Sequence, residues 1–256
     1  MEKRIISIFF VWRLILTLVV AAAVFLVPET RTSRQFFPEV LWQRGLPQWV
    51  WAWANFDGVH YVSIARSGYF LNQQPFFPLY PYAINLVNEL GGFHRFLNGQ
   101  IISGQIVSAG AFILSLLIIT KLVRKDARPS LIPWVMGAMV VFPTAYSYTA
   151  VYNDALFLLF ACLTILWARE RRWRLAGAAG ALATLTRLNG LALVFLILAE
   201  YARLDWQWRL WIPKLRTAFT RKPFSRSGIL WVGAIPAAFI GYLLYVERWF
   251  GSWQWV

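Results

Sequence analysis

The sequence predicts an all-α fold: a polytopic bundle of transmembrane helices with an outer-face loop that carries short amphipathic helices. Two observations lead to this fold class. The chain of 256 residues is 59% hydrophobic, and it contains 15 tryptophans. This composition excludes an ordinary soluble domain, and tryptophan is enriched where a membrane meets water. We expect residues 1–256 to form a single transmembrane domain.

The first apolar run predicts a transmembrane helix at 7–27. It follows a basic start, Met1-Glu2-Lys3-Arg4, and is interrupted by Arg13 and a few small polar residues. The run is long enough to cross a bilayer, and no small-residue cleavage site clearly ends it. We therefore expect a retained membrane helix and not a signal peptide.

Further apolar spans follow at 99–121, 131–148, 154–168 and 229–247. The stretch 175–204 fits either one long tilted helix or two short helices that meet near Asn189-Gly190. Loop charge favours the two helices, because they keep all three basic clusters on the cytoplasmic side. These clusters lie near 124–128, 169–174 and 203–226. The prediction is about seven spans, an inner N-terminus and a basic cytoplasmic loop at 203–228.

The formal net charge of +14 has the same explanation. Basic loops that face anionic lipid account for it, so we expect membrane lipids as partners and no nucleic acid. The one cysteine, Cys162, lies in an apolar run and excludes an intrachain disulfide.

This topology places three polar segments on the outer face: the first outer loop at 28–98, the Tyr146–Asp154 turn and the Arg187–Gly190 turn. Their convergence on one side is what an active site requires. The final residues, from Gly251 to Val256, are typical of the start of another outer loop. We therefore expect a truncated chain, with further spans after Val256.

Residues 57–68 are the first candidates for chemistry. In a helix over this range, Asp57, His60 and Tyr61 share one face, and Ser67-Gly68-Tyr69 ends the helix. A helix N-terminus stabilises a negative charge, so Asp57 is either a reactive carboxylate or only an N-cap. Asp154, which opens the span at 154–168, has the same two interpretations.

Three other features have a functional and a structural interpretation. Pro75, Pro78 and Pro81 favour extended backbone that cannot continue a helix, as an interfacial connector or as a wall that guides a lipid or sugar. Arg187 either binds a phosphate or extends to water. His94 has no partner at a useful spacing and is expected to be an interfacial loop residue. No metal-ligand spacing is visible.

Three blocks in order resemble the first outer loop of the phosphatidylinositol-glycan class V mannosyltransferases and their prokaryotic relatives. They read FDGVHY from Phe56, IARSGY from Ile64 and FFPLYP from Phe76. Two weaker matches, YNDALF from Tyr152 and TRLNG from Thr186, extend the resemblance to about residues 50–200. Phe56 replaces the family's usual tryptophan, and Asp154 replaces a glutamate, which leaves the reach of that carboxylate undetermined. The resemblance leads us to expect further helices after Val256, which belong to a complete family member.

The resemblance implies a GT-C type glycosyltransferase that moves a sugar from a polyprenyl-phosphate carrier to a hydroxyl of a glycolipid or glycan. The expected sugar is mannose, and its anomeric centre is inverted in the transfer. Asp57 is then the catalytic base, and His60 orients it or touches the carrier phosphate. Arg187 neutralises the phosphate and Asp154 positions donor or acceptor. The remaining predicted substrate-binding residues are Tyr61, Tyr80 and Asn189. No cofactor is indicated, and the need for a divalent metal and the oligomeric state stay open.

We expect a multi-pass protein of a prokaryotic plasma membrane, or of the endoplasmic reticulum in a eukaryote, with its active site outside. A transporter or lipid flippase is the alternative, because it has the same apolar spans and could use Asp57 and Asp154 as coupling groups. In a transporter, however, such carboxylates are expected at mid-membrane helix breaks, whereas Asp57 and Asp154 are expected at outer helix ends. No internal repeat is visible either. A non-catalytic scaffold subunit is a third possibility.

Overall fold

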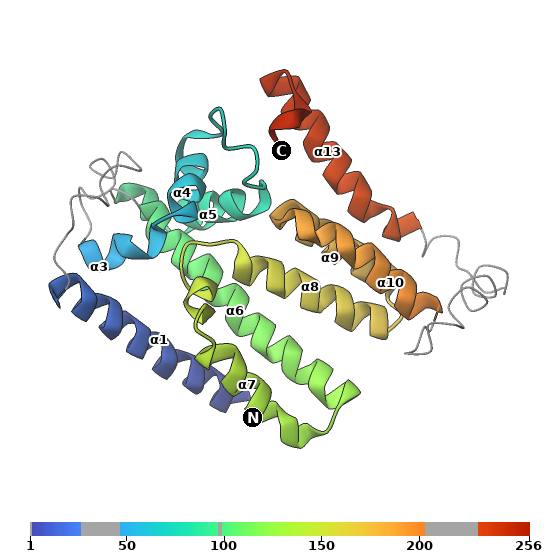
Figure 1. The fold of residues 1–256 in the computed structure, drawn as a ribbon, viewed down its shortest axis with the longest axis horizontal. Helices are drawn as coiled ribbons and strands as arrows, with labels where there is room; N and C mark the ends of the chain where they lie inside the picture. The colour runs from blue at the N-terminus through green and yellow to red at the C-terminus, as the bar shows by residue number, and fades with distance from the viewer. Residues whose placement is uncertain (1, 27–46, 97–98, 203–229) are drawn as a thin grey trace. The chain divides into compact units, whose positions relative to one another are not determined.

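A computed structural model describes residues 2–26, 47–96, 99–202 and 230–256 (Figure 1). Within these ranges the chain forms α-helices joined by turns and short 3₁₀ segments, and no strand occurs. Three helices are long and apolar enough to cross a membrane: Lys3–Leu26, Gly99–Asp126 and Leu230–Phe250. The all-α membrane fold is confirmed. The predicted basic loop at 203–228 and part of the predicted outer loop, 28–46 and 97–98, lie outside the described residues.

The described chain divides into two compact units. The first contains Met1–Phe76 and Tyr80–Ala155, and the second contains Phe77–Leu79 and Leu156–Val256. Most of the predicted site residues belong to the first unit, whereas Arg187 and Asn189 belong to the second.

In the first unit, α1 (Glu2–Leu26) packs on α6 (Gly99–Asp126) through aromatic rings. Phe112 of α6 lies 6.1 Å from Phe9 and 5.6 Å from Trp12, between ring centroids. Hydroxyls along α6, such as that of Ser115, donate to carbonyls four residues earlier. That bond satisfies a polar group inside an apolar helix, which a span in lipid requires.

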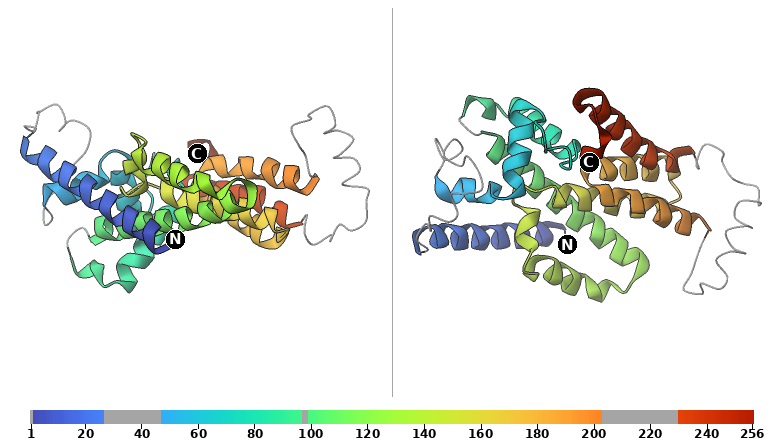
Figure 2. Two further views of the ribbon diagram at one scale, coloured as in Figure 1. Left: turned by 90° about the horizontal axis from the view of Figure 1, so that it is seen from below. Right: turned by 45° about the horizontal axis from the view of Figure 1, so that its top comes forward.

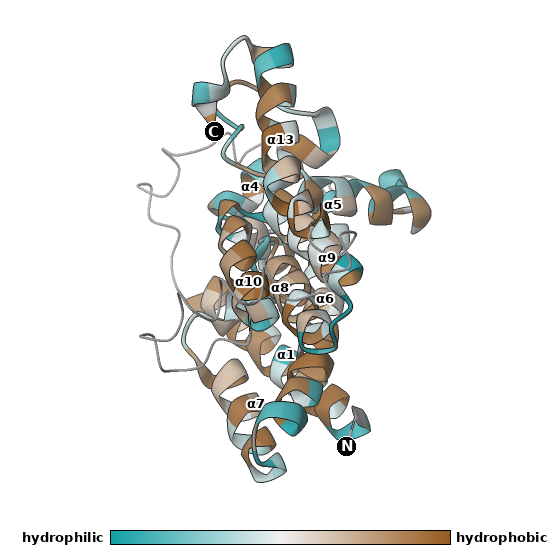
Figure 3. Cartoon of the chain, turned by 90° about the vertical axis from the view of Figure 1, so that its right-hand side faces the viewer, coloured by the Kyte–Doolittle hydropathy of each residue, from teal (hydrophilic) through white to brown (hydrophobic). Residues whose placement is uncertain are grey.

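The span predicted at 131–148 is helical only over α7, Ile132–Val141, which is about 15 Å long. A bilayer core is about 30 Å thick, so α7 covers roughly half of it. The chain then continues as turns and one 3₁₀ segment, Ala145–Tyr148, up to Asp154. In Figure 3, α1 and α7 are predominantly apolar, and hydrophilic residues gather toward the ends of the helices.

The predicted outer loop carries short helices: α3 (Gln48–Trp51), α4 (Asp57–Ser67) and α5 (Leu79–Leu90). α4 ends as expected at Gly68, whose φ of +79° suits glycine. The expectation that Pro81 lies in extended backbone is wrong, because Pro81 is in the first turn of α5. A proline fits there, since the first N–H groups of a helix have no acceptor within the helix.

The second unit contains α9 (Trp173–Thr186), α10 (Leu193–Ala202) and α13 (Ala234–Phe250). It also contains α8 (Asp154–Arg169), except for the first two residues of that helix. The helix break expected near Asn189-Gly190 is present, and α9 and α10 lie side by side (Figure 2). Arg169 Nε lies 3.1 Å from Glu200 Oε1, so α8 and α10 end next to each other. The number of membrane crossings stays a prediction.

Candidate active site

Asp57 is the first residue of α4, and its side chain is exposed. Phe56 occupies the cap position. In the first turn of the helix, the N–H groups of Gly58 and Val59 donate to the carbonyls of Asn55 and Phe56, each over 3.1 Å. Among the described residues, none forms a hydrogen bond or ion pair with the Asp57 carboxylate. Asp57 is therefore not the N-cap of α4, and its role as a reactive carboxylate stays a prediction.

Phe56 holds the start of α4 in an unusual conformation. Its φ is +54°, a region that non-glycine residues rarely adopt, and its ring is largely exposed. The next glycine packs closely: a Cβ on Gly58 would lie 3.2 Å from the carbonyl oxygen of Val151. The Val151 N–H in turn donates to Trp53 O over 2.9 Å. The segments before Asp57 and before Asp154 are therefore joined.

His60 lies one turn after Asp57 and is half-buried. Its ring stacks on Phe76 at 4.5 Å between centroids, and its Nδ1 lies 3.5 Å from Gln73 Nε2. Burial lowers the pKa of the His60 imidazole, and the charge of Asp57 opposes that shift. The imidazole is therefore neutral at pH 7 and is near enough to the carboxylate to feel its charge.

Tyr61 and Tyr80 form the packing beneath α4. Tyr80 is fully buried, with its hydroxyl 2.7 Å from Ser108 Oγ, and its ring lies 4.9 Å from that of Tyr61. Burial raises the pKa of the Tyr80 phenol, and the charge of Asp154 raises it too, whereas the Ser108 hydrogen bond lowers it. Direct contact of either tyrosine with substrate stays a prediction.

Tyr152 connects the two predicted carboxylates. Its hydroxyl donates to Asn55 O over 3.0 Å, two residues before Asp57, and its main chain leads into Asp154 at the start of α8. Burial raises the pKa of the Tyr152 phenol, and the charges of Tyr146, Asp57 and Asp154 raise it further. The Tyr152 side chain therefore ties the segment before Asp57 to the segment before Asp154. Sequence reasoning did not select Tyr152, although it adjoins Asp154 in a recognised block.

Arg13 is a second residue that the sequence analysis passed over. It lies near the middle of α1, and its guanidinium donates to Thr149 Oγ1 over 2.8 Å and to Gln105 Oε1 over 2.5 Å. Its Cζ is 3.7 Å from the centre of the Trp53 ring. Within the described chain, these partners are all neutral. The available signal was the charge itself, because an ionisable residue inside a span indicates a functional site.

A cavity of about 460 Å³ lies beside these groups in the first unit. One wall is α1, from Trp12 to Val20, and the others come from residues 52–56, from 140–146, and from Ala150 and Tyr152. Apolar side chains dominate it, and Asn55, Tyr146 and Tyr152 supply polar groups. Its volume is within the roughly 300–1,000 Å³ that is usual for small-molecule sites.

Arg187 and Asn189 lie at the turn between α9 and α10. Arg187 has an extended conformation, its N–H donates to Ala183 O over 2.9 Å, and it is half-buried. Asn189 is exposed in the 3₁₀ segment Leu188–Ala192. Their predicted contact with the substrate stays a prediction.

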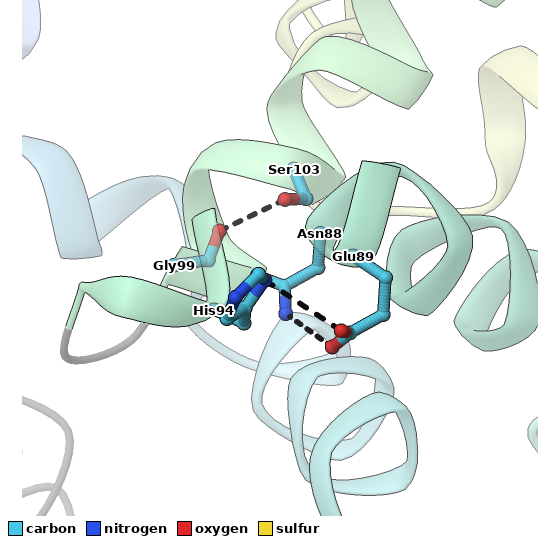
Figure 4. Close-up of polar contacts among 5 residues, drawn as sticks. All are labelled: Asn88, Glu89, His94, Gly99 and Ser103. Carbon is cyan, nitrogen blue, oxygen red and sulfur yellow. Dashed lines mark hydrogen bonds and ion pairs between the residues drawn. The ribbon is translucent and has the colours of Figure 1, made fainter. Parts of the chain in front are cut away.

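His94 does have a partner, contrary to the sequence-based expectation. Its Nδ1 lies 3.6 Å from Glu89 Oε2, and the Asn88 amide donates to the same carboxylate over 3.3 Å (Figure 4). Glu89 and His94 meet because Gly92, which lies between them with a φ of +70°, turns the chain back after α5. His94 and Glu89 are both largely exposed, so this pair closes a loop. No set of three His, Cys, Asp or Glu side chains in the described ranges could hold a metal ion.

A family model described as "Mannosyltransferase (PIG-V)" matches residues 2–242. No curated protein and no solved structure matches the chain.

Proposed function

The chain belongs to the PIG-V mannosyltransferase family, and from this premise we propose that it transfers mannose from a polyprenyl-phosphate carrier to an acceptor hydroxyl on the outer face of the membrane, with inversion. Membership of the family over residues 2–242 makes the chain a glycosyltransferase, and its three long apolar helices make it a membrane protein. The donor, the stereochemistry and the orientation are the proposal.

The observation that supports the reaction most directly is the carboxylate of Asp57. It is exposed, it begins a helix, and no described residue pairs with it. In an inverting transfer, the acceptor oxygen forms a bond to the anomeric carbon as the bond from that carbon to the phosphate oxygen breaks. The acceptor proton moves to Asp57, and the phosphate leaves with the electron pair.

Neighbouring residues supply orientation and charge. His60, one turn after Asp57, orients that carboxylate or contacts the carrier phosphate, and Tyr152 holds the segment before Asp57 through Asn55 O. Asp154, two residues after Tyr152 in the chain, positions a sugar hydroxyl. Arg187 remains the residue predicted to neutralise the departing phosphate, because a guanidinium binds phosphate oxygens with two donors. Asn189 remains a predicted substrate contact. The mechanism assigns no step to a metal ion.

The test is Asp57→Asn in isolated membranes supplied with a radiolabelled polyprenyl-phosphate mannose donor. An amide cannot accept the proton, so we expect kcat to fall by roughly 10²–10⁴-fold, the usual contribution of a general base. The matched control is Asp126→Asn, which makes the same change at an exposed aspartate at the end of α6 and should retain activity. Full activity of Asp57→Asn would exclude Asp57 as the base.

A further inference from the structure

Gln73 is a buried glutamine that lies beside His60, in the segment 69–76 that follows α4. The residue is 9% exposed, and its side-chain amide makes a contact at each end. The Gln73 Oε1 accepts the Phe70 N–H over 3.1 Å, and the Gln73 Nε2 lies 3.5 Å from His60 Nδ1. These two contacts together determine which atom of the amide faces the imidazole.

The contact with Phe70 sets the direction of the amide. A main-chain N–H can only donate, so the Gln73 atom that faces it is the carbonyl oxygen. The NH₂ group, which can only donate, therefore faces His60. The turn that carries this amide is held by two further bonds, because the Gln73 N–H and the Gln74 side-chain amide both donate to Phe70 O over 3.2 Å.

The direction of the amide determines the tautomer of His60. A neutral imidazole has one nitrogen that donates and one that accepts, so Nδ1 accepts from Gln73 and the proton lies on Nε2. An imidazolium would set a second N–H against the Gln73 amide. Burial also lowers the pKa of His60, whereas the charge of Asp57 on the same helix raises it. The segment 69–76, which packs on the ring, has Tyr69 as its only titratable residue.

Phe76 fixes the plane of the His60 ring. The two rings stack at 4.5 Å with an angle of 21° between their planes, and Tyr61 meets the Phe76 ring edge-on at 5.2 Å. The main chain of Phe76 is fixed as well, because its N–H donates to Gln73 O over 3.0 Å and its carbonyl accepts the Tyr69 hydroxyl over 2.5 Å. A donor whose direction is set in advance costs less entropy to use.

We propose that Gln73 is a positioning residue for the transfer reaction, because its amide holds His60 as the neutral tautomer with the proton on Nε2. What that proton does rests on the proposed function. Ionised carboxylate and phosphate oxygens only accept hydrogen bonds. Either role proposed for His60, orienting Asp57 or contacting the carrier phosphate, therefore needs a ring N–H. Gln73 places that N–H on the nitrogen that it does not contact.

The first test measures the tautomer by NMR and does not depend on turnover. The chain has two histidines, so ¹⁵N-histidine labelling gives two imidazole spectra, and His94→Gln assigns them. At mildly alkaline pH we expect the wild-type His60 proton on Nε2. In Gln73→Glu the proton should be on Nδ1, because a carboxylate accepts from it. Gln73→Met, which removes the amide without adding charge, should give both tautomers. A wild-type proton on Nδ1, or one tautomer in all three proteins, would overturn the inference.

The second test is the pH–rate profile of mannose transfer. Gln73→Glu keeps the size of the side chain and an acceptor for the Phe70 N–H, but its charge favours the imidazolium form of His60. The acid limb should therefore move to higher pH by about one unit or more. Gln73→Met should lower kcat by roughly 2–10-fold, the usual effect of losing one hydrogen bond.

The matched control is Asn72→Asp, which makes the same amide-to-carboxylate change at the exposed neighbouring residue and should keep the wild-type acid limb. An equal shift in Asn72→Asp and Gln73→Glu, or no shift in Gln73→Glu, would contradict the positioning role. Failure of the wild type to transfer mannose would instead count against the proposed function, and the tautomer measurement would still decide the state of His60.

Discussion

At the scale of single residues, Arg13 shows how a charge inside a membrane helix is accommodated. A guanidinium away from water is costly unless its donors are satisfied. Here Thr149 and Gln105 accept two hydrogen bonds, and the face of Trp53 lies against the cation. The residue thereby joins α1, α6 and both segments that lead to the carboxylates. We assign it a positioning role.

Arg13→Lys should destabilise the protein, because lysine keeps the charge but cannot make the same forked hydrogen bonds and stacking. The expected loss is about 1–3 kcal/mol, the value of one or two hydrogen bonds to a charged group. Thermal unfolding in detergent measures it. Arg4→Lys, the same change at an exposed residue of α1, should have no effect. Equal stability of the two variants would contradict the assigned role.

The burial of His60 predicts that stability and activity both decrease at acid pH. Burial lowers the pKa of His60 below its ordinary value of 6.5, so the folded protein holds the neutral imidazole. The stability that this preference contributes is complete above pH 6.5 and is lost as the pH falls through the lower folded pKa. Activity that needs neutral His60 should fall over the same range.

The measurement is a pH–rate profile, with His60→Asn as the comparison, because asparagine keeps a hydrogen-bonding group that does not titrate in this range. We expect the variant to be less active and to lose the part of the acid limb that His60 causes. An acid limb of the same shape in both proteins would assign it to another group.

At the scale of elements, loop charge favoured the break between α9 and α10, and local signals predicted the start of α4 at Asp57 and its end at Gly68. They failed at Pro81, where the residue type allows both a helix start and extended backbone. They failed again at α7, because an apolar run does not reveal where a helix ends. Each error concerns a position whose conformation depends on what packs against it.

The packing of α9 provides a test at this scale. A Cβ on Gly177 would lie 2.1 Å from the Trp231 carbonyl oxygen, so Gly177→Ala must move backbone and should destabilise by about 1–3 kcal/mol. Gly241→Ala on α13 is the control, since nothing lies within 4 Å of its Cβ. It should be neutral or up to about 1 kcal/mol stabilising, because alanine favours helix over glycine. Chemical denaturation compares the two, and equal effects would refute the close approach.

At the scale of the whole molecule, the predicted orientation is tested by labelling. Cys162 is the chain's one cysteine and is buried, so Cys162→Ala provides a background without reactive thiols. In that background, a membrane-impermeant maleimide should label Ser67→Cys in intact cells, and Glu170→Cys only after permeabilisation. Both native residues are exposed. The reverse pattern would place the candidate active site on the cytoplasmic side.

Composition and spacing predicted the membrane class, the all-α fold and the prominence of Asp57 and Asp154, and the resemblance of three sequence blocks indicated the family. These properties follow from residue type and from local order, and both can be read along a chain. The tertiary structure decided that the Tyr152 hydroxyl binds Asn55 O, that Arg13 stacks on Trp53 and binds Thr149, and that a cavity is lined by α1 and by Asn55, Phe56 and Tyr152. These relations join residues that are up to 136 positions apart, as Arg13 and Thr149 are. No periodicity in the sequence encodes such pairs, because they exist only once the helices have packed.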